Sequence, residues 1–541
     1  MQHSKGFIAY LIITAALCGA LVMVVEVLGS RVIGPFFGVS LFVWTSLITV
    51  TMVALATGYA IGGHWSDRRS SPDWLYGIIM VSGLLEILIP ALKGQILQMS
   101  LPLGLRWGSL TSAFLLFGPS LFLLGCVSPY VVKIAAREMH NIGKTVGSFY
   151  AISTIGSVIG TLLTGFVLIA YLGVNQIFLL TGALQIALGV VYFVFFRRKW
   201  VPVIAVIVPL LFLPHEVQVS KIMPDGTRVE RITNRDSFYG NLKVVDYSYQ
   251  SVRYRELLID GLVQGGIDVS NGQSVYEYAY FLQFLPYALY PEGRNCLVIG
   301  LGAGLVPAWY QAQGVATEVV DIDPAVIEIS RSYFGFNPAI PVHVEDARYF
   351  LINTKQRYDF MVLDVFNGDT TPGHLLSVEA MRLAKKRLTP DGVLAINLIG
   401  SIKHHTLMTE SVIKTLQSVF DQVEIYPAFN VSSGDGTGNL EIMAYDGTKR
   451  KPQFDRIVNK TIHPEVESSV RFSIQQSFAL PMSTNAMILS DNYNPVDFYD
   501  LWLKEKIRRI IIETTDFEIL LSQSETSQVW NFDQKRPAIL G

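Results

Sequence analysis

Residues 296–304 read Cys-Leu-Val-Ile-Gly-Leu-Gly-Ala-Gly, and two further apolar runs follow: residues 318–324, Glu-Val-Val-Asp-Ile-Asp-Pro, and residues 358–364, Tyr-Asp-Phe-Met-Val-Leu-Asp. Each run is apolar without alternation and ends in glycine or a carboxylate. Strands buried on both faces of a parallel sheet have this continuous pattern. We therefore expect a Rossmann-like α/β sheet, with its ligand beyond the carboxyl ends of the strands.

The glycines and the acid that follows them indicate a nucleoside site. Gly300, Gly302 and Gly304 let the backbone approach a ligand closely, and Asp321 stands where it can accept hydrogen bonds from ribose hydroxyls. No Gly-Lys-Ser/Thr follows, so the segment is not a P-loop. Adenosine joined to something other than pyrophosphate fits better, and a tight turn without a ligand is the alternative.

The composition is uneven along the chain. Of 541 residues 50% are hydrophobic and 16% are charged, and the apolar excess lies before about residue 215. The net charge of −2 gives no indication of nucleic-acid binding. Cys18, Cys126 and Cys296 are too far apart for a disulfide framework or a zinc-binding spacing, so we predict no metal.

The N-terminal part has the pattern of a membrane domain. Runs long enough to cross a bilayer lie near 7–29, 40–62, 74–92, 109–132, 146–170 and 173–196, and a shorter seventh, 200–214, contains two prolines. The first run is too long for a cleavable signal and lacks a cleavage site. Lys and Arg cluster in alternate loops, which predicts a cytoplasmic N-terminus. The side on which the rest lies depends on whether the seventh run crosses.

Two carboxylates fall inside these runs. A charge in mid-span costs roughly 2.5–3.5 kcal/mol on insertion scales, so Glu26 and Glu86 are expected to face the bundle. For Glu26 two interpretations stay open, a structural pair with Arg31 or a proton or substrate relay. Three glycines suit close helix packing: Gly156, Gly160 and Gly165. The loop at 62–69 resembles a signature of major-facilitator transporters, but we do not infer transport from it.

We divide the chain into four parts. Residues 1–214 form a transmembrane helical domain, 215–290 a small β-rich part, 291–447 a Rossmann-like nucleoside-binding domain, and 448–541 a mixed, helical extension. Alternation over 227–266 predicts a small antiparallel sheet. Strands near 423–427 and 440–445 would complete a seven-stranded, methyltransferase-type sheet. The polar turn at 489–495 either covers a site or caps a helix.

From about residue 235 to 430 the motifs resemble spermidine synthase in order and spacing. The matching stretches are Ser237-Phe-Tyr239-Gly240, Leu258-Ile-Asp260-Gly261-Leu-Val-Gln264, the glycine turn, Val320-Asp321-Ile-Asp323, Glu345-Asp346-Ala347 and Asp364. The N-terminal part resembles that of membrane-fused spermidine synthase-like proteins. The stretches that carry this likeness are Glu26 with Arg31, Gly58-Tyr-Ala-Ile-Gly62 and Tyr150-Ala-Ile-Ser-Thr-Ile-Gly156.

The resemblance implies decarboxylated S-adenosylmethionine as donor and a small amine as acceptor. It implies Asp321 on the ribose, Asp346 with Ala347 at the adenine, and Asp364 on the attacking amine, whose proton it would take. A carboxylate that caps the next helix is the alternative for Asp364. Further donor contacts are expected from Gln264 and Tyr278, and acceptor contacts from Tyr239, Asp369, His374 and Asp491. A homodimer is compatible with this.

The chain also departs from the family. Ala303 replaces the Asp that holds the donor's amine, Asn367 the second acid, Ala279 a Gln or His, and Gly240 an early Gln. A different acceptor is therefore plausible. Two alternatives stay open: a methyltransferase that uses S-adenosylmethionine itself, and a non-catalytic nucleoside or polyamine sensor coupled to a transporter-like membrane domain. Because S-adenosyl donors are cytosolic, we favour a multi-pass protein of the inner or plasma membrane whose synthase domain faces the cytoplasm.

Overall fold

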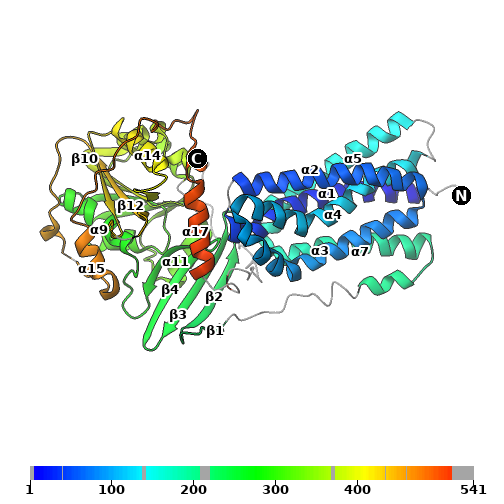
Figure 1. Cartoon of the computed structure of the whole chain (residues 1–541), viewed down its shortest axis with the longest axis horizontal. Helices are drawn as coiled ribbons and strands as arrows, with labels where there is room; N and C mark the ends of the chain where they lie inside the picture. Colours follow the sequence, from blue (N-terminus) through cyan, green and yellow to red (C-terminus); the bar gives the residue numbers. More distant parts are fainter. Residues whose placement is uncertain are drawn as a thin grey trace, which may run out of the picture. The chain divides into compact units, whose positions relative to one another are not determined.

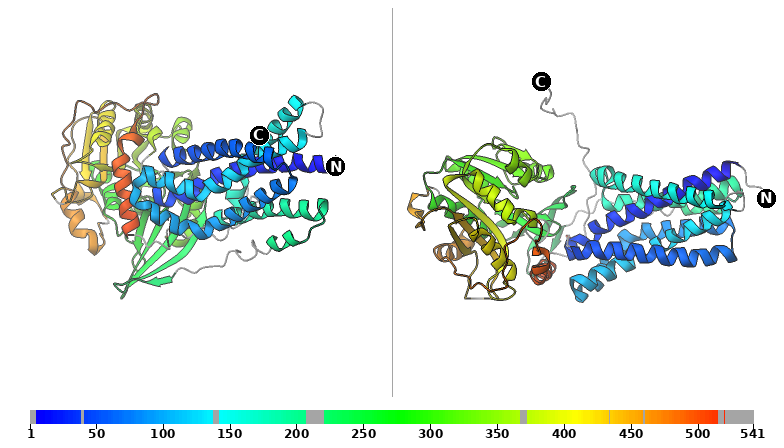
Figure 2. Two further views of the ribbon diagram at one scale, coloured as in Figure 1. Left: turned by 45° about the vertical axis from the view of Figure 1, so that its right-hand side comes forward. Right: turned by 90° about the horizontal axis from the view of Figure 1, so that it is seen from above.

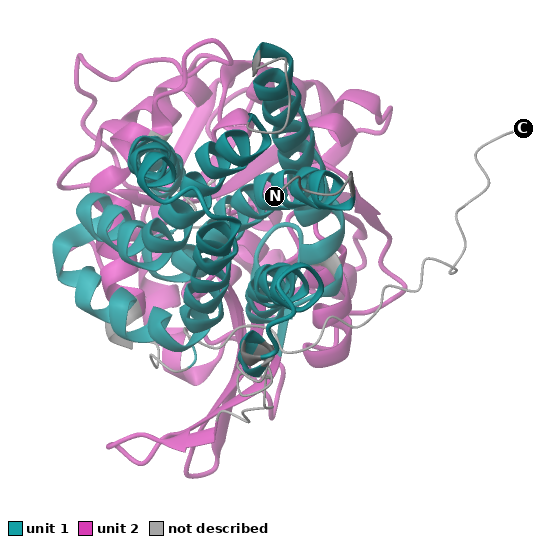
Figure 3. Cartoon of the chain, turned by 90° about the vertical axis from the view of Figure 1, so that its right-hand side faces the viewer, with its two compact units in different colours: residues 1–217, 234–241, 517–541 teal, residues 218–233, 242–516 magenta. Residues whose placement is uncertain are grey.

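The computed structural model of the chain describes residues 5–38, 41–136, 142–206, 220–366, 372–432, 434–458, 460–514 and 519. The chain divides into two compact units (Figure 3). The first comprises residues 1–217, 234–241 and 517–541, and the second comprises 218–233 and 242–516. The predicted boundary near 214 therefore lies close to a division of the chain. The finer boundaries at 290 and 447 stay predictions.

The first unit is a bundle of long helices that lie alongside one another (Figures 1 and 2). The long helices are α1 (Lys5–Phe37), α2 (Leu41–Arg68), α3 (Pro72–Ser100), α4 (Gly104–Ala136), α5 (Ile142–Leu163) and α7 (Val174–Val191). The shorter helical turns are η1 (Leu101–Leu103), η2 (Thr164–Leu168), α6 (Ile169–Tyr171), η3 (Tyr192–Phe196) and η4 (Val201–Val206).

Five helical segments of the described chain are long and apolar enough to cross a membrane. One of them, Pro72–Ala136, has 65 residues and contains α3, η1 and α4, and α4 begins at Gly104, where φ is +74°. Two of the six predicted runs fall in this segment, and the other four fall in one segment each. The seventh predicted run begins in η4, and its residues 207–214 lie outside the described residues.

Small residues bring α1 and α5 together. A Cβ atom added at Gly156 would stand 1.9 Å from the carbonyl oxygen of Ala16, and one added at Gly160 would stand 2.5 Å from that of Ala20. Such spacing allows close approach of two helix backbones in an apolar medium. The predicted packing role is thus confirmed for these two glycines, whereas Gly165 has no neighbour within 4 Å and takes no part.

The two carboxylates of the bundle are placed differently. Glu86 is fully buried, and the hydroxyl of Ser120 lies 3.4 Å from its Oε1. Among the described residues Glu26 and Arg31 do not form an ion pair, and one oxygen of Glu26 is buried without a hydrogen-bond partner. The predicted structural pair is therefore wrong; Glu26 is five residues from Arg31, which is further than the three or four that bring two side chains together on a helix.

The second unit begins with a small sheet, as the alternating pattern predicted. Its strands are β1 (Ser220–Ile222), β2 (Arg228–Asp236), β3 (Asn241–Tyr249), β4 (Val252–Ile259) and β5 (Leu262–Asp268), hydrogen-bonded in this order. The pairs β1–β2, β3–β4 and β4–β5 are antiparallel. Helix α9 (Glu277–Leu289) then leads into the main sheet.

The main sheet has seven strands in the order β11-β12-β10-β9-β6-β7-β8. They are β6 (Asn295–Ile299), β7 (Ala316–Asp321), β8 (Val342–Val344), β9 (Tyr358–Leu363), β10 (Leu388–Ser401), β11 (Gln422–Pro427) and β12 (Thr437–Tyr445). The five strands from β6 to β10 are mutually parallel, and β12 runs antiparallel to both β10 and β11. The predicted methyltransferase-type sheet is confirmed.

Helices cover this sheet. Between the strands lie α10 (Leu305–Ala312), α11 (Pro324–Tyr333), α12 (Ala347–Asn353), η5 (Gly373–Leu375), α13 (Val378–Arg387) and α14 (Leu407–Gln417). After β12 follow η6 (Phe454–Arg456), α15 (Pro464–Ser473), α16 (Val496–Tyr499) and α17 (Leu501–Thr514). These helices fall within the predicted extension, which as a separate part of the chain stays a prediction.

The alternation of side chains along the strands builds two cores. One face of the sheet packs on α9 through Val298, Val362 and Ala395, and the other packs on α13 and α14 through Ile299 and Leu363. Successive residues of a strand point to opposite faces. Two residues further along each strand, the α9 face carries the residues that end or follow the strand. At this carboxyl edge of the sheet the α9 face therefore changes from apolar to polar.

Candidate active site

The glycine turn after β6 is shaped by close backbone contacts. Gly300 has φ of +92°, and a Cβ atom there would stand 2.0 Å from the carbonyl oxygen of Asp364. Gly304, the N-cap of α10, has φ of +80°. A side chain would be strained at both positions, because a left-handed backbone conformation costs a residue other than glycine about 1–2 kcal/mol, and at Gly300 the close carbonyl oxygen leaves no room for a Cβ atom. The amide of Gly300 donates to Val320, which ties the turn to β7.

Asp321 ends β7 beside this turn. Its Oδ2 accepts a hydrogen bond of 2.8 Å from the amide of Leu301, and its Oδ1 accepts one of 2.8 Å from the amide of Asp323. Burial raises the pKa of Asp321 to about 6, although these amide hydrogen bonds oppose the rise. The carboxylate is thus held rigidly at the carboxyl edge of the sheet, where a ribose contact was predicted.

Asp346 is the N-cap of α12. Its Oδ1 accepts from the amide of Tyr349 at 2.9 Å, and its Oδ2 lies 3.4 Å from Nε2 of His374. The structure therefore brings together the two predicted residues Asp346 and His374. Ala347, the first residue of α12, is buried beside this carboxylate. A contact between Asp346 and adenine stays a prediction. If it forms, the same carboxylate both caps α12 and binds the base.

Asp364 follows β9 at the centre of the sheet. Its amide donates to the carbonyl of Ile299, and its Oδ1 accepts a 2.9 Å hydrogen bond from Nδ2 of Asn397 on β10. Asn397 in turn accepts from Nδ2 of Asn439 on β12 at 2.8 Å. Burial raises the pKa of Asp364 to about 6, and the Asn397 hydrogen bond works against it. Asp364 is not the N-cap of a helix, since the two residues directly after it, Val365 and Phe366, are not helical.

Tyr278 connects Asp364 with the small sheet. Its hydroxyl donates to the carbonyl oxygen of Gln264 on β5 at 3.2 Å. Burial raises the pKa of Tyr278 well above its ordinary value, and the charges of Asp364 and Glu441 raise it further. The phenol therefore lies near both carboxylates, and the structure brings two predicted residues, Gln264 and Tyr278, to the glycine turn and Asp364.

Of the remaining predicted residues, Asp491 joins the group formed by Asp346 and His374, because its ion-pair partner Arg348 also donates a 3.1 Å hydrogen bond to the carbonyl oxygen of His374. Asp491 forms an ion pair with Arg348, whose Nη1 lies 2.8 Å from its Oδ1, and this pair lowers the pKa of Asp491 to about 2. Tyr239 lies in the connection between β2 and β3, with 47% of its surface exposed. Asp369 falls outside the described residues. Acceptor contacts from these residues stay predictions.

Sequence reasoning missed three side chains of the site. Asn397 on β10 donates to the carboxylate of Asp364, Asn439 on β12 donates to Asn397, and Glu441 lies on β12 directly opposite Asn397. A signal was present, because Glu441 is a lone acid inside the apolar run Leu440-Glu-Ile-Met-Ala444. Such a residue is expected in the interior only when it has a partner or a function.

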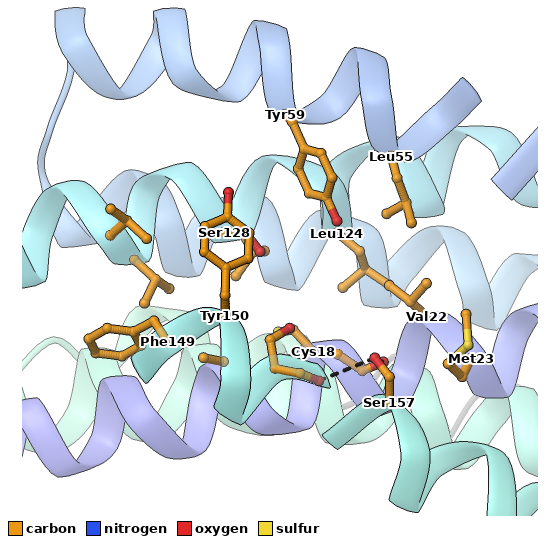
Figure 4. Close-up of a pocket in the computed structure, with 16 residues that line it drawn as sticks. Cys18, Val22, Met23, Leu55, Tyr59, Leu124, Ser128, Phe149, Tyr150 and Ser157 are labelled. Atoms are coloured by element: carbon orange, nitrogen blue, oxygen red, sulfur yellow. Dashed lines mark hydrogen bonds between the residues drawn. The ribbon is translucent and has the colours of Figure 1, made fainter. Parts of the chain in front are cut away.

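The helical unit contains a separate cavity of about 90 Å³ (Figure 4). Hydroxyl groups of Tyr59, Ser128, Tyr150 and Ser157 are among its lining, and Ser157 donates to the carbonyl of Gly19 at 2.9 Å. The space is sufficient for several water molecules. Neither Glu26 nor Glu86 lines it, so it gives no support to a carboxylate relay.

The fold and the arrangement of these side chains indicate a nucleoside-binding site next to a carboxylate that can act on a reacting group. A methyltransferase-type sheet presents a glycine turn, an acid at the end of the next strand, and a second acid at the end of the central strand β9. Such an edge can hold a nucleoside on one side and offer a carboxylate to a group that reacts with it.

Comparison with known proteins shows what this part of the chain is similar to. Residues 276–432 match the spermine/spermidine synthase domain, so the second unit carries a domain of that family. A polyamine aminopropyltransferase of Vibrio vulnificus is 32% identical over 163 residues, which are 28% of this chain and 51% of the relative. An N-terminal histidine N-methyltransferase of Emericella nidulans is 34% identical over 139 residues, 25% of either chain. These relatives are transferases.

The likeness is partial in extent. The chain spans about a quarter of the Emericella relative and about half of the Vibrio relative. Among solved structures, spermidine synthase from Thermotoga maritima is 17% identical, with a TM-score of 0.37 over 50% of this chain and 92% of that chain.

Proposed function

We propose that this protein is a membrane-embedded aminopropyltransferase that moves the aminopropyl group of decarboxylated S-adenosylmethionine to an amine. One observation carries the proposal: within the matched domain, Asp364 lies against the glycine turn, beside Tyr278 and across from Asn397. The turn and Asp321 supply the nucleoside contacts, and Asp364 supplies the base.

The reaction asks little covalent chemistry of the protein. The amine nitrogen attacks the carbon next to the sulfonium, the N–C bond forms, and the C–S bond breaks with its electron pair passing to sulfur. Methylthioadenosine leaves as a neutral molecule, so catalysis rests on orientation and exclusion of water. An ammonium has no lone pair, and Asp364 is therefore assigned to take the proton of the attacking amine.

Product analysis tests the proposal. Purified full-length protein in detergent is mixed with decarboxylated S-adenosylmethionine and a panel of diamines that begins with putrescine. We expect methylthioadenosine and an amine longer by one aminopropyl group. Absence of both products with every diamine would contradict the proposal. Calorimetric titration with methylthioadenosine separates a failed acceptor from a failed nucleoside site.

A second function is favoured by the N-methyltransferase relative, the one with the higher identity of the two compared above. In this alternative, S-adenosylmethionine itself is the donor and a methyl group is transferred. Incubation with methyl-labelled S-adenosylmethionine and membrane extract would then release S-adenosylhomocysteine. Binding of nucleosides without either product would favour a sensor.

Membrane embedding is the second part of the proposal. It is supported by the five long apolar segments. We expect the full chain to sediment with membranes after carbonate washing and to enter solution only with detergent; release by carbonate alone would contradict it. A cytoplasmic synthase domain predicts that a protease added outside intact cells leaves residues 220–514 uncut.

A further inference from the structure

Glu441 is a carboxylate that the proposed reaction does not yet use. It lies in the middle of β12, directly opposite Asn397 of β10 in the antiparallel ladder. Directly opposite residues project from the same face of a sheet. Asn397 and Asp364 therefore share the α9 face with Glu441, at the edge where the glycine turn lies.

The surroundings of Glu441 leave its charge uncompensated. Its side chain is 0% exposed, and in the described part of the chain neither carboxylate oxygen accepts a hydrogen bond. The described chain also provides no Lys or Arg in an ion pair with Glu441 or with Asp364. A buried, unpaired carboxylate is strongly unfavourable and is seldom retained without a partner.

The nearby amides are already engaged. Asn397 donates to Asp364 and accepts from Asn439, so this chain of hydrogen bonds orients Asp364 and does not reach Glu441. The charge of Asp364 acts on Glu441 as a repulsion, which adds to the effect of burial and raises the pKa of Glu441 further. Two carboxylates thus lie on the same face of the sheet, one on either side of Asn397, and in the described part of the chain neither forms an ion pair with a cation.

We propose that Glu441 and Asp364 together form the binding site for a primary alkylammonium group, the cationic end of the amine substrate. This inference rests on the proposed function and names the class of its acceptor. A cation placed between the two carboxylates removes their repulsion and supplies hydrogen-bond donors to the open oxygens of Glu441. Asp364, which Asn397 orients, then takes one proton of the ammonium, and Glu441 keeps its charge, which balances the substrate ammonium before this step and the positive charge that the nitrogen acquires when it forms the new N–C bond.

The test compares Glu441→Gln with Glu424→Gln in the full-length protein. Glu424 is a matched control on the adjacent strand β11, because it is also buried but is already paired with Tyr445 at 2.6 Å and with Lys449. For Glu441→Gln we expect the KM for the diamine to rise by about tenfold or more, since a buried charge partner of the ammonium is lost. The Kd for methylthioadenosine should not change in either variant.

Thermal unfolding without ligand distinguishes binding from a structural role. Because glutamine removes an unpaired buried carboxyl group and keeps its shape, Glu441→Gln should melt at the same temperature as the wild type or higher. A lower melting temperature with a weakened methylthioadenosine affinity would assign Glu441 to the fold and overturn the proposal. Glu441→Asp should recover part of the diamine affinity.

Direct titration of the diamine, with methylthioadenosine present, separates this inference from the proposed function. If the wild type turns over and Glu441→Gln has an unchanged diamine KM, the inference is wrong and the proposed function stands. If the wild type gives no product but binds diamine, and Glu441→Gln does not, the amine site stands and the proposed function is wrong. A wild type that does not bind diamine overturns the inference.

Discussion

Asp364 illustrates what a single side chain contributes at this site. In the described part of the chain only Asn397 donates a hydrogen bond to its carboxylate, which leaves it able to receive a proton from a substrate. We expect Asp364→Asn to reduce kcat by about 100-fold to 10,000-fold, the range for loss of a general base. Methylthioadenosine binding should be retained, as measured by calorimetry. Asp391→Asn, at an exposed position of β10, is the control, and an equal loss there or a wild-type kcat in Asp364→Asn would contradict the assignment.

The raised pKa values of two residues predict the pH dependence. Burial brings the pKa of both Asp321 and Asp364 to about 6, and both are assigned to act as carboxylates. Below pH 6, kcat/KM should therefore fall by about a hundredfold per pH unit, because both carboxylates are needed for the reaction. The affinity for methylthioadenosine depends on Asp321 alone and should fall by about tenfold per pH unit. Equal slopes in the two measurements would contradict separate roles.

The same raised pKa values affect the stability of the ligand-free protein in the opposite direction, because they favour the folded state at acidic pH. A carboxyl group whose pKa is higher in the folded than in the unfolded protein binds its proton more tightly when folded. The contribution of Asp321 and Asp364 to stability is therefore fully present below about pH 4 and is lost as the pH rises to about 6. The acidic conditions that favour these groups in the ligand-free fold are those in which the proposed reaction stops.

At the scale of elements, the turn between β6 and α10 depends on a close contact with the end of β9. Gly300→Ala would place Cβ 2.0 Å from the carbonyl oxygen of Asp364, whereas Gly314, with φ of +79°, has open space around it. Gly314→Ala should cost about 1–2 kcal/mol from backbone strain alone. Gly300→Ala should cost more and should also abolish methylthioadenosine binding. Melting temperatures and calorimetry check both, and equal effects of the two changes would show that the contact is unimportant.

At the scale of the whole molecule, the helical unit is held together where backbones touch. Gly156 faces the carbonyl of Ala16 on α1, whereas Gly147, on the same helix α5, has no neighbour within 4 Å. Gly156→Leu should therefore separate α1 from α5 and lower the melting temperature of the detergent-solubilised protein, and Gly147→Leu should leave it unchanged. Tryptic cleavage of the bundle under native conditions gives a second readout. An intact bundle in Gly156→Leu would contradict the packing inferred here.

Local sequence patterns determined much of this architecture. Continuous apolar runs that end in glycine or acid predicted the parallel strands, alternation predicted the small sheet, and long apolar runs predicted the helices of the first unit. These features can be predicted from the sequence because helices and strands repeat with fixed periods, and burial of one face imposes an apolar pattern with that period on a few neighbouring residues. The positions of Asp321 and Asp364 at the ends of strands follow from the same patterns.

The tertiary structure alone decided which side chains surround Asp364. Asn397 and Glu441 are far apart in the sequence, and they meet because β12 inserts antiparallel between β10 and β11 in one particular register. A shift by one residue would turn Glu441 to the opposite face. The lone acid in an apolar run is visible in the sequence, but its neighbours depend on the register between β12 and β10, and so only the folded chain shows that this open carboxylate lies opposite the asparagine that binds Asp364.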